Sequence, residues 1–302
     1  MHTDLPTGIR IEYDVRGPAS APPIVLIMGL GMQLIAWPVP LLEGLAARGW
    51  RVLRFDNRDA GLSSRIQTRR PIDLRPAMIR AMLGLPSRPP YTLEDMAADT
   101  AGLMDALGMA SAHVVGVSMG GMIAQVLAAK MPHRVRSLTS IMSSSGALRF
   151  RFHVSPATRA LLSRPPRDAT EAQLLAHAER VWGLIGSPGM RPAPDELRER
   201  LRKSMARGFN PMGVGRQMLA IMASGDRRPL LRTIRVPTLV MHGDLDPLVP
   251  IAAGRDTAAH VPGATFRVLH GMGHDLPDPM LPALVEAIAE HCARAEHGAK
   301  ER

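Results

Sequence analysis

The stretch of sequence that decides the fold covers residues 113–132 and reads HVVGVSMGGMIAQVLAAKMP. Its first part, residues 113–117, is a short run rich in valine, which is typical of a buried parallel strand. Residues 119–130 are mostly good helix formers, and Pro132 lies just beyond their end. One serine, Ser118, lies where the pattern changes. The sequence therefore predicts a strand, a tight turn at Ser118 and a helix.

The turn itself has the pattern Gly-x-Ser-x-Gly, with Gly116 and Gly120 on either side of Ser118. Glycine lacks the Cβ atom that would clash in a sharp turn between strand and helix, so the serine hydroxyl projects above the sheet edge. The backbone N–H of Met119 then points from the helix N-terminus toward an oxyanion formed at Ser118. This pattern favours a nucleophilic serine, provided that the chain also supplies a base and an acid. The alternative is a chance match to a short motif.

Composition limits the class of protein. The chain has 302 residues, of which 46% are hydrophobic, enough for one large domain with an elaboration. Its single cysteine, Cys292, excludes an intramolecular disulfide. No basic and then apolar leader is visible at the N-terminus, and the longest apolar run, residues 24–37, is too short for a membrane span. We expect a soluble, cytoplasmic protein with no membrane span.

The net charge of +10 is confined to one part of the chain. Residues 149–235 contain 17 Arg and Lys against 7 Asp and Glu, and the rest of the chain is balanced. Nucleic-acid binding is one interpretation of such a segment. However, aromatic residues for base stacking make up only 3% of the chain, and no nucleic-acid motif is present. We therefore expect no nucleic-acid partner and favour a solvated basic face or a mild preference for anionic substrates.

Strand and helix patterns alternate over most of the chain, which predicts an α/β fold with a mostly parallel twisted sheet and helices on both faces. The predicted strands are residues 9–15, 24–28, 52–55, 113–117, 135–141, 238–242 and 265–269. The predicted helices are residues 41–48, 93–107, 119–130, 251–260 and 281–293.

The alternation stops between residues 143 and 237. Residues 147–228 instead suggest helices broken by clusters of proline and glycine. We therefore predict a core domain formed by residues 1–146 and 229–302, with residues 147–228 inserted as a helical lid.

The base and the acid should follow later strands, because ligands in open α/β sheets bind at the carboxyl ends of the strands. One such loop offers Asp244 and Asp246, and the next offers His270 and His274. The order serine, aspartate, histidine is typical of proteins with this kind of serine turn. With His242, these side chains could also form a metal site, but no metal-ligand motif such as H-E-x-x-H is present. We expect neither a metal nor a cofactor.

Four segments together resemble the α/β-hydrolase superfamily, namely GVSMGG, HGDLDPLVP, GMGHDLP and FDNRDAGLSS. The resemblance covers nearly the whole chain apart from residues 147–228. The segment VLIMGLGMQLIAWP, together with FDNRDAGLS, narrows it to the serine carboxylesterase branch of small hydrolases that includes aclacinomycin methylesterase. In that branch the acid is the Asp directly before Pro, here Asp246, and the base is the His that closes Gly-x-Gly-His, here His274.

The resemblance also implies an oxyanion hole formed by the backbone N–H groups of Leu30 and Met119. This chain departs from the family pattern nearby, because Met28-Gly29 stands where the family has His-Gly. The departure removes a histidine that orders the loop, but it leaves the backbone donors in place.

The remaining expectations concern the pocket. Gly29, Met32, Trp37 and Met272 lie close in sequence to the catalytic loops and are expected to form an apolar substrate pocket. Asp56 and Arg58 are expected to form a structural turn rather than to take part in catalysis.

Together these features predict a serine hydrolase that cleaves short- to medium-chain acyl esters or methyl esters through an acyl-enzyme on Ser118. The partner is then a small-molecule ester. A lactonase or thioesterase using the same residues, and a non-catalytic ligand-binding homologue, remain alternatives. The sequence leaves open whether the chain is a monomer or a homodimer.

Overall fold

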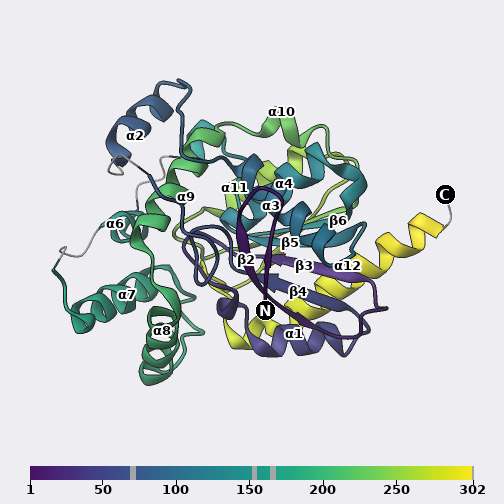
Figure 1. The fold of residues 1–302 in the computed structure, drawn as a ribbon, viewed down its shortest axis with the longest axis horizontal. Helices are drawn as coiled ribbons and strands as arrows, with labels where there is room; N and C mark the ends of the chain where they lie inside the picture. The colour runs from purple at the N-terminus through teal and green to yellow at the C-terminus, as the bar shows by residue number, and fades with distance from the viewer. Residues whose placement is uncertain (69–72, 152–154, 164–167, 301–302) are drawn as a thin grey trace.

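The computed structural model describes residues 1–68, 73–151, 155–163 and 168–300 (Figure 1). Within them, strands form one sheet in the order β1-β2-β4-β3-β5-β6-β7-β8. The pairs β1–β2 and β2–β4 are antiparallel, and every pair from β4 to β8 is parallel. The strands are β1 (His2–Asp4), β2 (Arg10–Arg16), β3 (Pro23–Ile27), β4 (Arg51–Phe55), β5 (Ala112–Val117), β6 (Val135–Ile141), β7 (Thr238–Gly243) and β8 (Thr265–Leu269).

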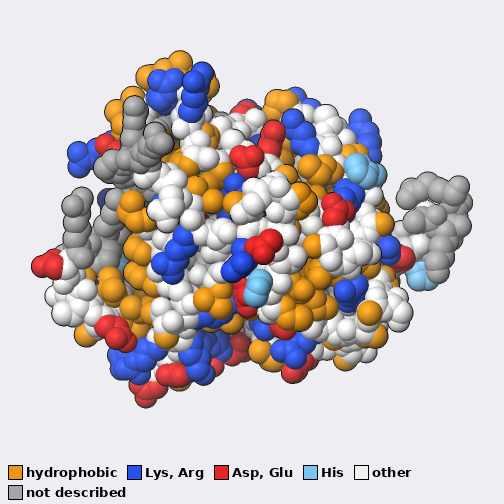
Figure 2. All heavy atoms as spheres, viewed as in Figure 1, with side chains coloured by type: hydrophobic (Ala, Val, Ile, Leu, Met, Phe, Trp, Pro, Cys, Tyr) orange, Lys and Arg blue, Asp and Glu red, His pale blue; other side chains and the backbone are white. Residues whose placement is uncertain are grey.

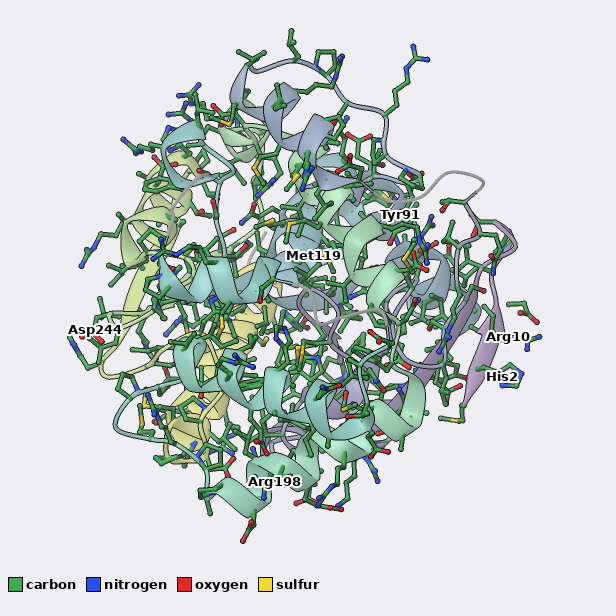
Figure 3. All side chains as sticks on the ribbon, turned by 90° about the vertical axis from the view of Figure 1, so that its left-hand side faces the viewer. His2, Arg10, Tyr91, Met119, Arg198 and Asp244 are labelled. Carbon is green, nitrogen blue, oxygen red and sulfur yellow. The ribbon has the colours of Figure 1, made fainter. Side chains whose placement is uncertain are left out.

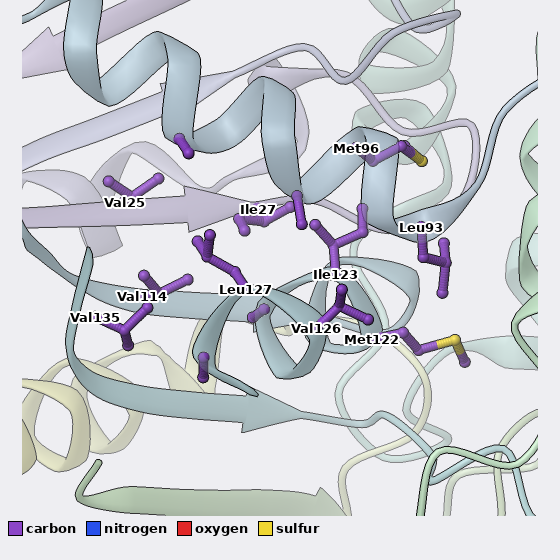
Figure 4. Close-up of a cluster of buried hydrophobic side chains, with 14 of the residues drawn as sticks. Val25, Ile27, Leu93, Met96, Val114, Met122, Ile123, Val126, Leu127 and Val135 are labelled. Carbon is purple, nitrogen blue, oxygen red and sulfur yellow. The ribbon is translucent and has the colours of Figure 1, made fainter. Parts of the chain in front are cut away.

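Helices cover both faces of the sheet. On one face, α3 (Leu93–Ala106) and α4 (Met119–Lys130) pack against apolar side chains of β3 and β5 (Figure 4). On the other face, α1 (Val39–Ala46) and α12 (Leu281–Lys300) enclose a second apolar cluster. The central strands β3 and β5 are buried along their whole length, as expected for a parallel sheet covered on both sides.

Two glycines allow α4 to begin directly against the sheet. A Cβ atom on Gly116 would collide with the backbone carbonyl of Gly120, and a Cβ atom on Gly120 would collide with the carbonyl of Ile27. The parallel register also pairs Ile27 with Gly116 and Val117 with Ile141. The loops that follow these strands therefore meet at one edge of the sheet.

The described residues between β6 and β7 are mostly helical. They contain α5 (Leu148–Arg151), α6 (Pro156–Leu162), α7 (Glu171–Ile185), α8 (Pro194–Gly208) and α9 (Pro211–Ser224), and α10 (Arg228–Leu231) follows. Helices α6, α7 and α8 lie together beside the sheet region, on the side where α2 (Leu74–Met82) projects (Figure 1). The helical character predicted for residues 147–228 agrees with these helices. Their role as a lid stays a prediction.

Most predicted elements are present within one or two residues of the expected bounds, and α4 and α11 (Ile251–His260) have the bounds predicted. Helix α12 is longer than expected, while β1 and α2 were not predicted. The α/β fold class is confirmed. Among the described residues, no helix combines the length and apolar character needed to cross a bilayer.

Candidate active site

Ser118 occupies a strained turn between β5 and α4. Its φ of 55° and ψ of −118° are uncommon for a residue other than glycine. The Ser118 N–H donates to the Ile141 carbonyl at 2.9 Å, and the Ser143 hydroxyl donates to the Ser118 carbonyl at 2.8 Å. Both bonds tie the turn to β6 and to the loop after it, so the side chain of Ser118 is held at the edge of the sheet.

A hydrogen-bonded chain joins three of the predicted site residues. The Oγ atom of Ser118 lies 3.0 Å from Nε2 of His274, and Nδ1 of His274 lies 2.7 Å from Oδ2 of Asp246. His274 and Asp246 are 9% and 7% exposed, so water has little access to the contact between them. Because an ionised carboxylate only accepts hydrogen bonds, Nδ1 of His274 carries a proton and Nε2 can accept one from Ser118.

Asp246 is held by its own loop and by a second histidine. Its Oδ1 accepts hydrogen bonds from the N–H groups of Leu248 and Val249 at 2.9 and 2.8 Å. Its Oδ2 lies 3.4 Å from Nε2 of His242. Burial alone would raise the pKa of the Asp246 carboxyl, but His274 and His242 together hold it below its usual range. The carboxylate therefore stays ionised at neutral pH.

The alternative pair left open by the sequence, Asp244 and His270, lies apart from this chain. Nδ1 of His270 is 2.8 Å from Oδ2 of Asp244, and the His270 side chain is 84% exposed. Figure 3 shows Asp244 at the periphery, whereas Met119 lies near the middle of the molecule. Asp244 and His270 therefore form a surface pair. Among the described residues, no group of three or more His, Cys, Asp or Glu side chains is arranged to hold a metal ion.

The loop expected to provide an oxyanion donor lies against the serine. A Cβ atom built on Gly29 would be 3.3 Å from the Cβ of Ser118, which is a tight contact, so the loop lies directly against the Ser118 turn. In the part of the chain that the structure describes, the N–H groups of Leu30 and Met119 donate to no other group. Both are thus free to bind a negatively charged oxygen.

Side chains from distant segments fix this loop in the absence of the usual histidine. Oε1 of Gln217, on α9, accepts a hydrogen bond from the Gly31 N–H at 2.7 Å, and its Nε2 donates to the Arg58 carbonyl at 2.8 Å. The Asn57 side chain donates to the Met28 carbonyl at 3.1 Å. Gln217 is fully buried, so these contacts hold the loop in a defined position.

The loop with the histidine is also held from the helical segment. The His274 N–H donates to the Ile185 carbonyl at 2.7 Å, and the Gly273 N–H donates to the Ser187 hydroxyl at 2.8 Å. Ser187 in turn donates from both its N–H and its hydroxyl to Oδ1 of Asp275. Burial raises the pKa of the Asp275 carboxyl, although the bonds from Ser187 act against this.

Asp56 and its neighbours form buried ion pairs, consistent with the structural turn expected from the sequence. Asp56 pairs with Arg207 of α8 at 2.6 Å and also accepts from the Leu34 N–H at 2.6 Å. Asp59 pairs with Arg216 of α9 at 2.7 Å. Residues 147–228 are therefore attached to the sheet region through buried charges rather than through a simple hinge.

Ser118 and His274 line a cavity of about 1950 Å³. Its walls come from the loops after β3 and β5, from α7 and α8, and from part of α2. Gly29, Met32 and Trp37, three of the residues expected in the substrate pocket, are among those that line it.

The position of Met272 differs from the prediction that this residue lines the pocket. Its side chain is fully buried in the cluster between the sheet and the helices α1 and α12, and it does not line the cavity. The loop after β8 turns inward at this residue, and the Met272 carbonyl accepts a hydrogen bond from the Leu245 N–H at 3.2 Å.

Three residues hold parts of the site through hydrogen bonds or close polar contacts that the sequence does not predict, namely Gln217, His242 and Ser187. His242 was considered only as a metal ligand, although its place two residues before Asp244 put it on the strand that leads to the acid loop. Gln217 and Ser187 come from the helical segment and reach the site only through tertiary packing. No local pattern marks either of them.

Comparison with known proteins supports the α/β fold and relates the chain to a known family. The family model described as "alpha/beta hydrolase fold" matches residues 22–278. A rhodomycin D methylesterase of Streptomyces peucetius is 30% identical over 92% of this chain and 93% of its own length. A second rhodomycin D methylesterase, from Streptomyces sp. (strain C5), is 29% identical with the same coverage.

A solved structure resembles this one over nearly its whole length. The enol-lactonase from Burkholderia xenovorans is 25% identical with a TM-score of 0.74, and the match covers 97% of this chain and 100% of the other. The family match spans the strands that position Ser118, Asp246 and His274. The chain therefore belongs to the α/β-hydrolase family.

Proposed function

We propose that this hydrolase cleaves carboxylic esters, with Ser118 as the nucleophile, His274 as the base and Asp246 as the acid of a catalytic triad. The observation that supports this most strongly is the hydrogen-bonded chain of these three side chains at the wall of a large cavity. Methylesterases among its relatives support the same class of reaction.

In the proposed reaction, Nε2 of His274 takes the proton of Ser118 as Oγ attacks the ester carbonyl. Asp246 accepts the Nδ1–H bond and stabilises the positively charged imidazole. The N–H groups of Leu30 and Met119 bind the oxyanion of the tetrahedral intermediate, and each such donor contributes about 3 kcal/mol. His274 then gives its proton to the leaving alcohol, and water repeats the same steps on the acyl-enzyme.

The cavity helps to choose among esters. Ligand pockets are commonly about 300–1,000 Å³, and this cavity of about 1950 Å³ is larger. A methyl ester of a bulky acid would fill more of it than an acetyl or butyryl ester. Together with the names of the relatives, the volume favours methyl esters of large, mainly apolar acids. In this proposal residues 147–228 act as a lid, and they form walls of the part of the cavity that holds the acid portion of the ester.

The test compares the wild type and Ser118→Ala on two substrate series. One series is p-nitrophenyl esters from acetate to palmitate, and the other is methyl esters of acids of increasing ring number. We expect turnover that is absent in Ser118→Ala and higher kcat/KM for the bulkier methyl esters. No turnover of either series by the folded wild type would instead favour a ligand-binding protein. A set of lactones is assayed beside the two series, and faster turnover of these would favour the lactonase alternative suggested by the enol-lactonase structure.

A further inference from the structure

Helix α2 and the residues directly after it expose a group of large apolar side chains. Ile79, Met82, Leu83 and Leu85 are between 48% and 67% exposed, and all four lie within residues 79–85. The opposite side of the helix is packed, since Ala77 and Ala81 are buried and α2 contacts α9. Ile79 and Met82 therefore lie on the outward face of a docked helix, and Leu83 and Leu85 follow its last residue.

The same segment is basic. Arg75, Arg80 and Arg88 are exposed, and none of them forms an ion pair with another described residue, although Nε of Arg80 donates to the Pro86 carbonyl at 2.7 Å. Residues 64–90 contain six arginines and a single acidic residue, Asp73, which caps the start of α2. In the space-filling view, hydrophobic and basic atoms lie together over α2 (Figure 2). We call residues 75–88 the α2 surface.

A helical segment that combines exposed apolar side chains with arginines that form no ion pair is suited to the boundary between lipid headgroups and acyl chains. The apolar side chains enter the outer acyl region, while the arginines remain among anionic headgroups. A protein partner would need acidic groups placed to match three separate arginines, whereas an anionic bilayer offers negative charge everywhere. The charge of this surface therefore favours a lipid occupant.

Helix α2 also borders the substrate cavity. Met78 and Ala81 line the same cavity as Ser118 and His274. A helix bound at a membrane surface would thus place the cavity next to a source of lipophilic molecules. We propose that the α2 surface docks this protein on anionic membranes, so that apolar substrates enter the cavity from the bilayer.

Co-sedimentation with vesicles tests the docking without relying on the proposed esterase activity. The full-length wild type is mixed with vesicles of phosphatidylcholine alone, or of phosphatidylcholine with phosphatidylglycerol. We expect binding to the anionic vesicles that falls as salt is added, and little binding to the neutral ones. Replacing Arg75→Gln and Arg88→Gln should weaken binding about fivefold for each arginine removed.

The apolar contribution is tested with the double variant Ile79→Glu, Leu83→Glu, which should abolish vesicle binding. The matched control is Leu184→Glu, which alters a leucine of α7 that is 40% exposed and distant from α2 in the sequence; this variant should bind as the wild type does. Circular dichroism and hydrolysis of a soluble ester check that each variant is folded. Should the double glutamate variant fail to fold, Ile79→Ser with Leu83→Ser replaces it and should still weaken binding.

Two results would overturn the proposal. One is a folded wild type that binds neither kind of vesicle, or binds both equally with no effect of the α2 variants. The other is a wild-type dimer by light scattering that the Ile79→Glu, Leu83→Glu variant converts to a monomer without any vesicle binding, because a second copy of the chain would then cover the surface.

Discussion

The two sides of the cavity contribute different things to the site. The loops of the sheet side supply the side chains that we propose to react, namely Ser118, His274 and Asp246. The helical segment, residues 147–228, holds backbone groups beside the site, because the Gly31 N–H donates to Gln217 and the His274 N–H donates to the Ile185 carbonyl. The reacting groups are thus local to short loops, while their positions depend on contacts from far along the chain.

The largest expected effect is on the sheet side. Replacing Asp246→Asn should lower kcat by about 10⁴, because the histidine would lose the carboxylate that fixes its tautomer. The matched variant is Asp244→Asn, which alters the exposed pair with His270 and should change kcat by less than about threefold. Steady-state kinetics on one ester measures both. The reverse ranking would assign the acid to Asp244.

The second effect concerns how firmly the helical segment is attached. Replacing Arg216→Met leaves Asp59 buried without its guanidinium partner, and breaking such a pair costs about 3–5 kcal/mol of stability. The surface pair of Arg228 and Asp226 provides the control, since Arg228→Met should cost far less stability than Arg216→Met. Denaturant unfolding gives both values. Equal costs would mean that the buried pairs do not attach the segment.

The third effect tests whether the helical segment positions the oxyanion loop. The change Gln217→Met keeps the shape of the side chain but removes both of its hydrogen bonds. We expect kcat to fall about 10- to 100-fold with little change in KM. Binding of a trifluoromethyl ketone, which forms a tetrahedral adduct, should weaken in parallel.

The control is Met212→Gln, at an exposed position of α9, the helix that carries Gln217. This variant should leave kcat, KM and inhibitor binding unchanged. If Gln217→Met lowers only the thermal stability and leaves kcat and inhibitor binding intact, Gln217 has a structural role and no influence on the oxyanion loop.

The smallest expected effect is on how the free energy of unfolding depends on pH. The pKa of Asp275 is raised by burial, so the native state binds its proton more readily than the unfolded state, and the stability contributed by this group is lost as pH rises. The change Asp275→Asn keeps an acceptor for Ser187 and removes the buried charge. We expect the variant and wild type to unfold alike in acid, where the carboxyl is protonated, and the variant to be more stable at neutral pH. A difference in free energy of unfolding that does not change with pH would contradict this.

The sequence predicted the sheet side well because its signals are local. Valine-rich runs, glycines around Ser118 and the order of the three loops gave the strands, the α/β fold and the residues that the structure brings together. The family prediction is confirmed by the match over residues 22–278. The prediction that Met272 lines the pocket was wrong, because closeness in sequence to His274 does not determine which way a loop residue turns.

The helical side could be predicted only as helices. Gln217 of α9 accepts a hydrogen bond from the Gly31 N–H, a contact that no sequence pattern near Met28-Gly29 reveals. Helix α2 lies in a segment rich in arginine and proline, a composition more typical of loops, and its capping by Asp73 is a short-range feature that is common outside helices too. These elements depend on packing against distant parts of the chain.

The most direct test of the central claim is covalent labelling of the native protein with a fluorophosphonate, followed by mass spectrometry of the intact chain and of its peptides. The reagent reacts with a serine whose hydroxyl is activated by a neighbouring base. We predict one adduct per chain, on Ser118, that is lost in Ser118→Ala and strongly slowed when His274→Ala removes the base. A folded protein that gives no adduct, or one labelled at another serine, would contradict the assignment of Ser118 as the nucleophile.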